Sequence, residues 1–153
     1  MPIGIRKTLP ILAFALLGPS VVVGQAAAAS PAVVHVDLMD PSSGPSIKSM
    51  MIQTDQQRVK AGPVTFMVSN DSKTLVHEMI VVSVADPKTP LPYDGKNDRV
   101  IESKIKDLGE ASDLPAGEKK TLVLTLKPGN YILLCNQPSH YKAGMRANLT
   151  VIP

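Results

Sequence analysis

Residues 33–152 consist of short apolar runs separated by turn residues, and this pattern constrains the fold more than any other feature of the chain. The runs span 33–39, 64–69, 77–84, 121–126, 131–135 and 145–152. β-branched residues are common in them, several alternate apolar with polar side chains, and Gly, Pro, Asn and Asp separate them. Several short strands joined by such turns predict an all-β domain, folded as an antiparallel sandwich or barrel.

One segment, 85–117, departs from this pattern because it is long and rich in Pro, Asp and Lys. Within it, four apolar residues have the spacing of one helical face: Val100, Ile101, Ile105 and Leu108. Glu102 and Lys106, four residues apart, would support such a helix as an ion pair. We therefore expect a long excursion loop that contains a short helix.

The N-terminus has the features of a secretory signal peptide. Arg6 and Lys7 form a basic start, an almost wholly apolar stretch follows at 9–23, and a stretch rich in small residues follows at 24–30. We expect cleavage within two residues of position 28, which leaves one domain at 29–153 in the periplasm or outside the cell. No later run is long enough to cross a bilayer as a helix.

The charge of the expected domain excludes one class of function. The full chain has a net charge of +3, and loss of Arg6 and Lys7 lowers it to +1, since the expected signal peptide contains no acidic residue. A nearly neutral domain gives no electrostatic reason to expect nucleic-acid binding.

The only cysteine of the chain lies in the stretch 135–145, CNQPSHYKAGM, which has the spacing C-x4-H-x4-M. A single cysteine cannot form a disulfide within an exported chain, so the thiol is inert and buried, pairs between molecules, or reacts or binds a ligand. The stretch joins two expected strands, so Cys135, His140 and Met145 can converge on one ion. Thiolate, imidazole and thioether suit copper far better than calcium or magnesium.

A second imidazole would complete a blue-copper ligand set of one Cys, two His and a weak axial Met. His35 and His77 are the remaining histidines. We expect His77 to be the ligand because it begins the apolar strand 77–84, whereas alternation places His35 with Asp37 in an exposed or edge position. The predicted metal ligands are therefore His77, Cys135, His140 and Met145.

The stretches VHEM at 76–79 and YILLCNQPSHYKAGM at 131–145 resemble the cupredoxins, the small blue-copper proteins, and the resemblance covers roughly residues 33–153. The ligand loop, C-x-x-P-x-H-x-x-x-G-M, is most similar to that of the rusticyanins and auracyanins. The resemblance implies a Greek-key β-sandwich, one type 1 copper ion and electron transfer by Cu(I)/Cu(II) cycling without catalysis. It also implies redox proteins as partners, such as a c-type cytochrome or a terminal oxidase or reductase; we expect a monomer.

One position departs from the family pattern. Many cupredoxins have Asn or Ser directly after the first ligand histidine, and here the residue is Glu78. Its carboxyl group could accept hydrogen bonds from backbone amides of the ligand loop, or it could face solvent and add negative charge. Such neighbours tune the reduction potential, so the resemblance does not fix its value.

Other functions fit parts of the sequence. A periplasmic copper chaperone or buffer would bind Cu(I) through methionines, and the candidates are Met39, Met50, Met51, Met67 and Met79. A copper enzyme would need a second copper centre, which three histidines cannot supply. A thiol enzyme would use Cys135 and His140 but gives Met145 no role. In a metal-free adhesion module the ligand spacing would be accidental.

Overall fold

The computed structural model describes residues 30–46 and 48–153, so the predicted signal peptide at 1–28 lies outside the described residues.

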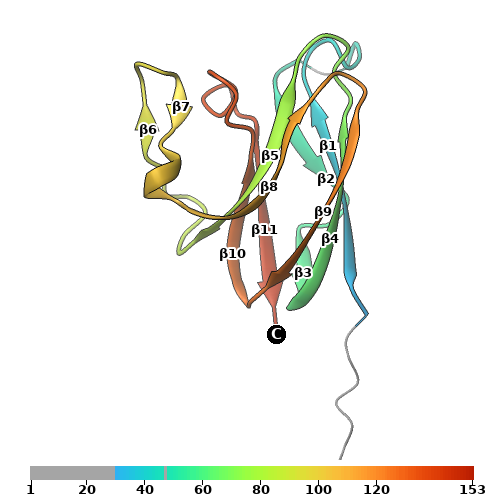
Figure 1. The fold of residues 1–153 in the computed structure, drawn as a ribbon, viewed down its shortest axis with the longest axis vertical. Coiled ribbons are helices and arrows are strands. Elements are labelled where there is room, and N and C mark those ends of the chain that lie inside the picture. Colours follow the sequence, from blue (N-terminus) through green and yellow to red (C-terminus); the bar gives the residue numbers. More distant parts are fainter. Residues whose placement is uncertain (1–29, 47) are drawn as a thin grey trace, which may run out of the picture.

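The described chain forms two facing β-sheets with a small two-stranded extension beside them (Figure 1). The first sheet has the order β2 (Met51–Thr54), β1 (Ala32–Met39), β4 (Gly62–Asn70) and β9 (Lys119–Leu126). The second has the order β3 (Arg58–Lys60), β11 (Arg146–Ile152), β10 (Gly129–Leu134), β5 (His77–Val84) and β8 (Lys106–Leu114). The extension contains β6 (Tyr93–Asp94) and β7 (Arg99–Val100), followed by a 3-10 turn, η1 (Glu102–Lys104). Within the described residues, no helix is both long and apolar enough to cross a membrane.

The main core lies between the two sheets and follows from the alternation of side chains along the strands. In β4, Val64, Phe66 and Val68 are buried, whereas Met67 between them is exposed. In β10, Tyr131 and Leu133 point into the same core, and Cys135 directly after the strand joins them. This arrangement is the one predicted from the alternation of 64–69 and of 131–135.

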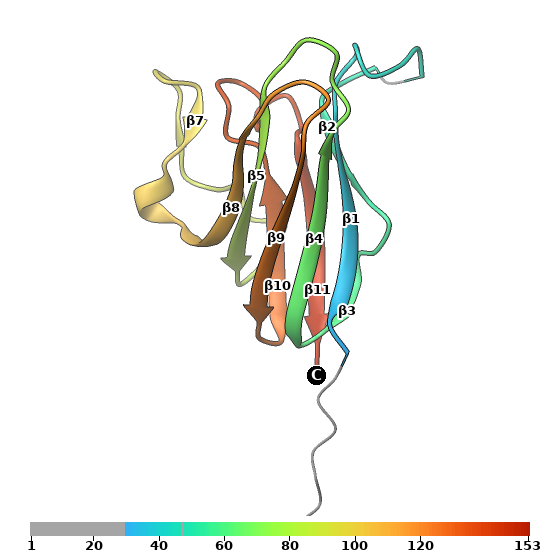
Figure 2. The same cartoon turned by 45° about the vertical axis from the view of Figure 1, so that its right-hand side comes forward.

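The continuously apolar strands β5 and β10 are covered on both faces. Met79 and Val81 of β5 face the main core, while Ile80 and Val82 belong to a second cluster on the outer face of the sheet. That second cluster includes Leu91 from the segment that leads into β6, and Figures 1 and 2 show this extension beside the second sheet. The extension therefore buries apolar side chains that would otherwise face water.

The all-β sandwich is confirmed, and the six predicted strands correspond to β1, β4, β5, β9, β10 and β11 with ends shifted by at most two residues. The strands were predicted to be antiparallel, but the two sheets are mixed. β1 pairs with β4 in parallel, and β3 pairs with β11 in parallel. The short strands β2 and β3 were not predicted. They are too short and too polar for an alternation signal to stand out.

The prediction for 85–117 is wrong in part. The expected helix is only the single turn η1, and 106–114 forms a full strand, β8, along β5. The register between β5 and β8 shifts twice, so β8 contains extra residues at two bulges. These bulges space the inward side chains Leu108, Ala111 and Leu114 three apart. Spacing by three breaks the alternation that marks a strand, which explains why β8 was not predicted.

Candidate metal centre

The four predicted ligands gather at one end of the sandwich, opposite the end where the C-terminus lies (Figure 1). His77 is the first residue of β5, Cys135 follows β10 directly, and Met145 directly precedes β11. β5 and β10 are antiparallel neighbours, so the start of one lies beside the end of the other. The topology therefore brings His77 to the loop that contains Cys135 and His140.

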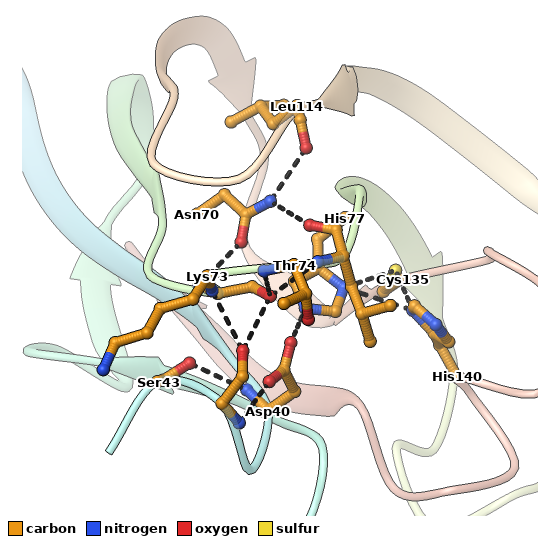
Figure 3. Close-up of polar contacts among 12 residues, drawn as sticks. Asp40, Ser43, Asn70, Lys73, Thr74, His77, Leu114, Cys135 and His140 are labelled. Atoms are coloured by element: carbon orange, nitrogen blue, oxygen red, sulfur yellow. Dashed lines mark hydrogen bonds and ion pairs between the residues drawn. The ribbon is translucent and has the colours of Figure 1, made fainter.

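Three donor atoms converge at this end, as Figure 3 shows for His77, Cys135 and His140. The two Nδ1 atoms are 3.2 Å apart, and Sγ of Cys135 lies 3.3 Å from Nδ1 of His140 and 4.0 Å from Nδ1 of His77. A point equidistant from the three atoms lies roughly 2.1 Å from each, close to the usual bond lengths from a transition metal to His nitrogen and Cys sulfur. The triangle of donors thus has the size of a metal site.

The ligand loop is closed by backbone hydrogen bonds that extend the pairing of β10 with β11. Cys135 N–H donates to the carbonyl of Met145 at 3.1 Å, and Met145 N–H donates to the carbonyl of His140 at 3.0 Å. The loop needs two left-handed backbone conformations, at Ser139 (φ 68°) and at Gly144 (φ 99°). Met145 is fully buried and belongs to the same apolar cluster as Cys135. The loop therefore places the thioether and the thiol on the same inner side.

The environment favours the uncharged form of all three donor groups in the metal-free protein. Burial, together with the neighbouring His77, lowers the pKa of His140 to about 4. Burial also lowers the pKa of His77, although hydrogen bonding to Asp40 opposes this effect. Burial raises the pKa of the Cys135 thiol to about 11. A metal ion bound here would have to displace the thiol proton, whereas burial already disfavours protonation of the two imidazoles.

Asp40 is a partner of the site that the sequence did not reveal. It directly follows β1, is almost fully buried, and its Oδ2 lies 3.1 Å from Nε2 of His77 (Figure 3). Burial acts to raise the pKa of Asp40, but hydrogen bonds with Ser42, Ser72 and His77 outweigh it and lower the pKa to about 2. The carboxyl group is therefore ionised at neutral pH. No spacing rule links position 40 to position 77, so only the fold could identify this contact.

Glu78 occupies the position at which the sequence departs from the family pattern. It is only 7% exposed, and its Oε1 accepts a hydrogen bond of 3.0 Å from the backbone N–H of Asn136, the residue after Cys135. Burial, and then the nearby Glu110, raises the pKa of Glu78 to about 7, although the hydrogen bond from Asn136 opposes this shift. Of the two alternatives, the first is therefore right: Glu78 binds the backbone of the ligand loop and does not face solvent.

His35 is not part of the site. It is exposed on the outer face of β1, opposite Met67 of β4. The predicted exposure is confirmed, although β1 lies inside its sheet and is not an edge strand.

The extension around β6 and β7 is bonded to the ligand loop at several points. The side chain of Asn136 accepts from the N–H of Val100 at 2.6 Å and donates to the carbonyl of Val100 at 3.0 Å. Ser139 N–H donates to the carbonyl of Asp98 at 2.7 Å, and the hydroxyl of Tyr141 accepts from a backbone N–H of the extension. The extension and Glu78 therefore both hold the loop at Asn136, the extension through its side chain and Glu78 through its backbone N–H.

Replacement of Asn136 by alanine should destabilise the metal-free protein. Val100 is 3% exposed, so its N–H and carbonyl would lose their partner without gaining full access to water. We expect the free energy of unfolding in urea to fall by about 2–6 kcal/mol, since two buried polar groups are left unpaired and each costs about 1–3 kcal/mol. Asn97→Ala is the matched control in the same extension, because the side chain of Asn97 makes only an exposed hydrogen bond to Asp94, which water can replace; it should change stability by less than about 1 kcal/mol. Equal losses in both variants would mean that Asn136 does not anchor the extension.

The chain was compared with family models, curated proteins and solved structures. Residues 41–152 match the family model described as copper binding proteins, plastocyanin/azurin family. A search of curated proteins gave no significant match.

Solved structures share the fold at low sequence identity. Reduced auracyanin from Roseiflexus castenholzii is 20% identical, with 82% of this chain and 100% of that chain covered and a TM-score of 0.55. Auracyanin A from Chloroflexus aurantiacus is 18% identical, with coverages of 80% and 100% and a TM-score of 0.55. Rusticyanin from Thiobacillus ferrooxidans is 19% identical, with coverages of 80% and 79% and a TM-score of 0.58.

Proposed function

Because the chain belongs to the plastocyanin/azurin family of copper-binding proteins, we propose that it is an exported electron carrier whose single type 1 copper ion is held by His77, Cys135, His140 and Met145. The observation that carries this proposal is the triangle formed by two Nδ1 atoms and one Sγ atom, within 4.8 Å of one another and buried. Copper bound there would supply one-electron chemistry by alternating between Cu(I) and Cu(II).

Each side chain has a distinct role in this proposal. Cys135 would provide the thiolate, and His77 and His140 would provide imidazoles that suit either oxidation state. Met145 would provide a thioether that donates only weakly to the copper ion. The four residues are at most 9% exposed, and the sandwich and the extension fix the backbone around them. A buried site with four protein donors has no evident position for a substrate, which favours electron transfer over catalysis at the metal.

In this proposal, electrons pass between the copper ion and a partner protein through the end of the sandwich where the ligands lie. His140 is 9% exposed, whereas His77, Cys135 and Met145 are fully buried. Leu75 and Val76, directly before His77, are exposed large apolar side chains. A redox partner protein, such as a c-type cytochrome, would dock at this end. Export to the periplasm is proposed from the signal-peptide features of residues 1–28.

A copper chaperone or buffer is the second candidate, and the methionines give it little support. Met79 is fully buried and Met39 is 9% exposed, both with apolar neighbours of the core, while Met67 is exposed on the outer face of β4. Core packing is the usual role of such methionines.

Repeated redox cycling separates the two candidates. The copper-loaded protein is reduced with ascorbate and reoxidised with ferricyanide over several cycles, in the presence of a Cu(I) chelator. An electron carrier should regain its full colour and copper content after each cycle. Transfer of most of the copper to the chelator on the first reduction would favour the chaperone and contradict the proposal.

His35→Ala should leave the copper site unchanged. His35 is exposed on the outer face of β1 and does not belong to the cluster of His77, Cys135 and His140. We expect the same visible spectrum as the wild-type protein and a reduction potential that differs by no more than the error of the measurement. Loss of colour in this variant would mean that His35, and not His77, is the second imidazole ligand.

A further inference from the structure

A buried carboxylate lies directly behind His77, on the side of the ring opposite the other donors. Oδ2 of Asp40 is 3.1 Å from Nε2 of His77, while Nδ1 of the same ring is 3.2 Å from Nδ1 of His140. Figure 3 shows the two contacts on opposite sides of the imidazole. The side chains of Asp40 and His77 are 2% and 0% exposed, so water does not compete with either contact.

The carboxylate is held in place by the backbone around it. Ser42 N–H donates to Oδ1 of Asp40 at 2.6 Å, which leaves Oδ2 for His77. The hydroxyls of Ser42 and Ser72 lie 3.1 Å apart, and Ser72 N–H donates to the buried Asn70. Among the described residues, His77 is the only cationic or imidazole side chain within ion-pair distance of Asp40. Asp40 is thus a fixed hydrogen-bond acceptor, and the one imidazole side chain that it contacts belongs to His77, a predicted metal ligand.

This contact determines where the proton of His77 lies. A carboxylate can only accept hydrogen bonds, so Nε2 of His77 must be the donor. A neutral imidazole carries one proton, which leaves Nδ1 with a free electron pair directed towards Sγ of Cys135 and Nδ1 of His140. A metal-binding histidine whose other nitrogen donates to a carboxylate is better oriented and a stronger donor.

We infer that Asp40 is a positioning residue of the metal centre: it holds His77 in the Nε2–H tautomer and, through its negative charge, strengthens Nδ1 as a donor to Cu(II). The effect on copper rests on the proposed function, whereas the tautomer is a property of the metal-free protein. Since negative charge near the site stabilises Cu(II) more than Cu(I), Asp40 lowers the reduction potential.

Asp40→Asn tests this role because an amide of the same shape has only one acceptor oxygen. That oxygen should take the short hydrogen bond from Ser42 N–H, so the NH₂ group faces Nε2 of His77 and favours the Nδ1–H tautomer. We expect nitrogen NMR of the metal-free variant to show a shift of at least tenfold in the tautomer ratio. We also expect Cu(II) affinity to fall by about 10–100-fold. A tenfold greater loss for Cu(II) than for Cu(I) raises the potential by about 59 mV.

Asp71→Asn is the matched control, because Asp71 is an exposed carboxylate close in sequence to Asn70 and Ser72. It removes the same charge without touching His77, so it should leave the tautomer unchanged and the potential nearly so. Equal effects of the two variants on tautomer and potential would overturn the inference.

The wild-type protein alone provides a second test that does not depend on a variant that folds. A metal-free wild-type protein in which His77 carries its proton on Nδ1 would overturn the inference directly. If the wild-type protein has the Nε2–H tautomer but shows no intense copper band, the proposed electron carrier is contradicted. The inferred role of Asp40 in fixing the tautomer of His77 would then still be supported.

Discussion

Cys135→Ser is expected to abolish the intense visible absorption of the copper-loaded protein while leaving the β-sandwich folded. The absorption of a type 1 site comes from charge transfer between the Cys thiolate and Cu(II), and a serine hydroxyl does not form the equivalent anion at neutral pH. Cys135 is fully buried and follows the last residue of β10, so a residue of similar size should be tolerated there. We expect complete loss of the intense band, measured at equal protein concentration with one equivalent of Cu(II).

The far-UV circular dichroism spectrum is the control for folding in this experiment, and it should match that of the wild-type protein. His35→Ala is the control for the loss of a potential metal-binding side chain elsewhere. An intense band that persists in Cys135→Ser would remove Cys135 from the ligand set and, with it, the proposed type 1 site.

Met145→Leu is expected to keep the colour but to raise the reduction potential. Met145 is fully buried beside Cys135, and leucine replaces it with similar volume, so stability should fall by less than about 1.5 kcal/mol. A thioether that donates weakly to copper in both oxidation states would, on removal, cost the more highly charged Cu(II) more. We expect an upward shift of about 60 mV, which corresponds to a tenfold change in the ratio of Cu(I) to Cu(II) affinity.

Met79→Leu is the matched control for this substitution. Met79 is also fully buried in the main core and lies two residues along β5 from His77. Its replacement by leucine is the same chemical change, made away from the predicted axial ligand. Its potential should stay close to that of the wild-type protein. A potential that is unchanged in Met145→Leu, or raised equally in both variants, would argue against Met145 as the axial ligand.

The strands that the sequence predicted well are those in which local pattern and final environment agree. The run 77–84 is continuously apolar because both faces of β5 are covered, and its predicted ends are those of the strand. β8 was missed because two bulges place Leu108, Ala111 and Leu114 at intervals of three, and pairing with β5 decides its structure. The parallel pairs β1–β4 and β3–β11 depend on long-range topology that no local pattern contains.

The residues of the site also fall into those that local sequence predicts and those that only the fold reveals. Cys135, His140 and Met145 could be predicted because one loop between two strands contains them, and His77 because it begins the strand next to that loop. Asp40 could not be predicted, since its contact with His77 joins the end of β1 in one sheet to the start of β5 in the other. The role of Glu78 was left between two alternatives, and the nearby N–H of Asn136 distinguishes them.

The most direct test of the account is a visible absorption spectrum of the purified protein after addition of one equivalent of Cu(II), recorded before and after ascorbate. The account predicts an intense thiolate-to-copper band that saturates at one copper per chain, disappears on reduction and returns on reoxidation. A colourless or merely pale product, with Cys135 still reactive as a free thiol, would contradict it.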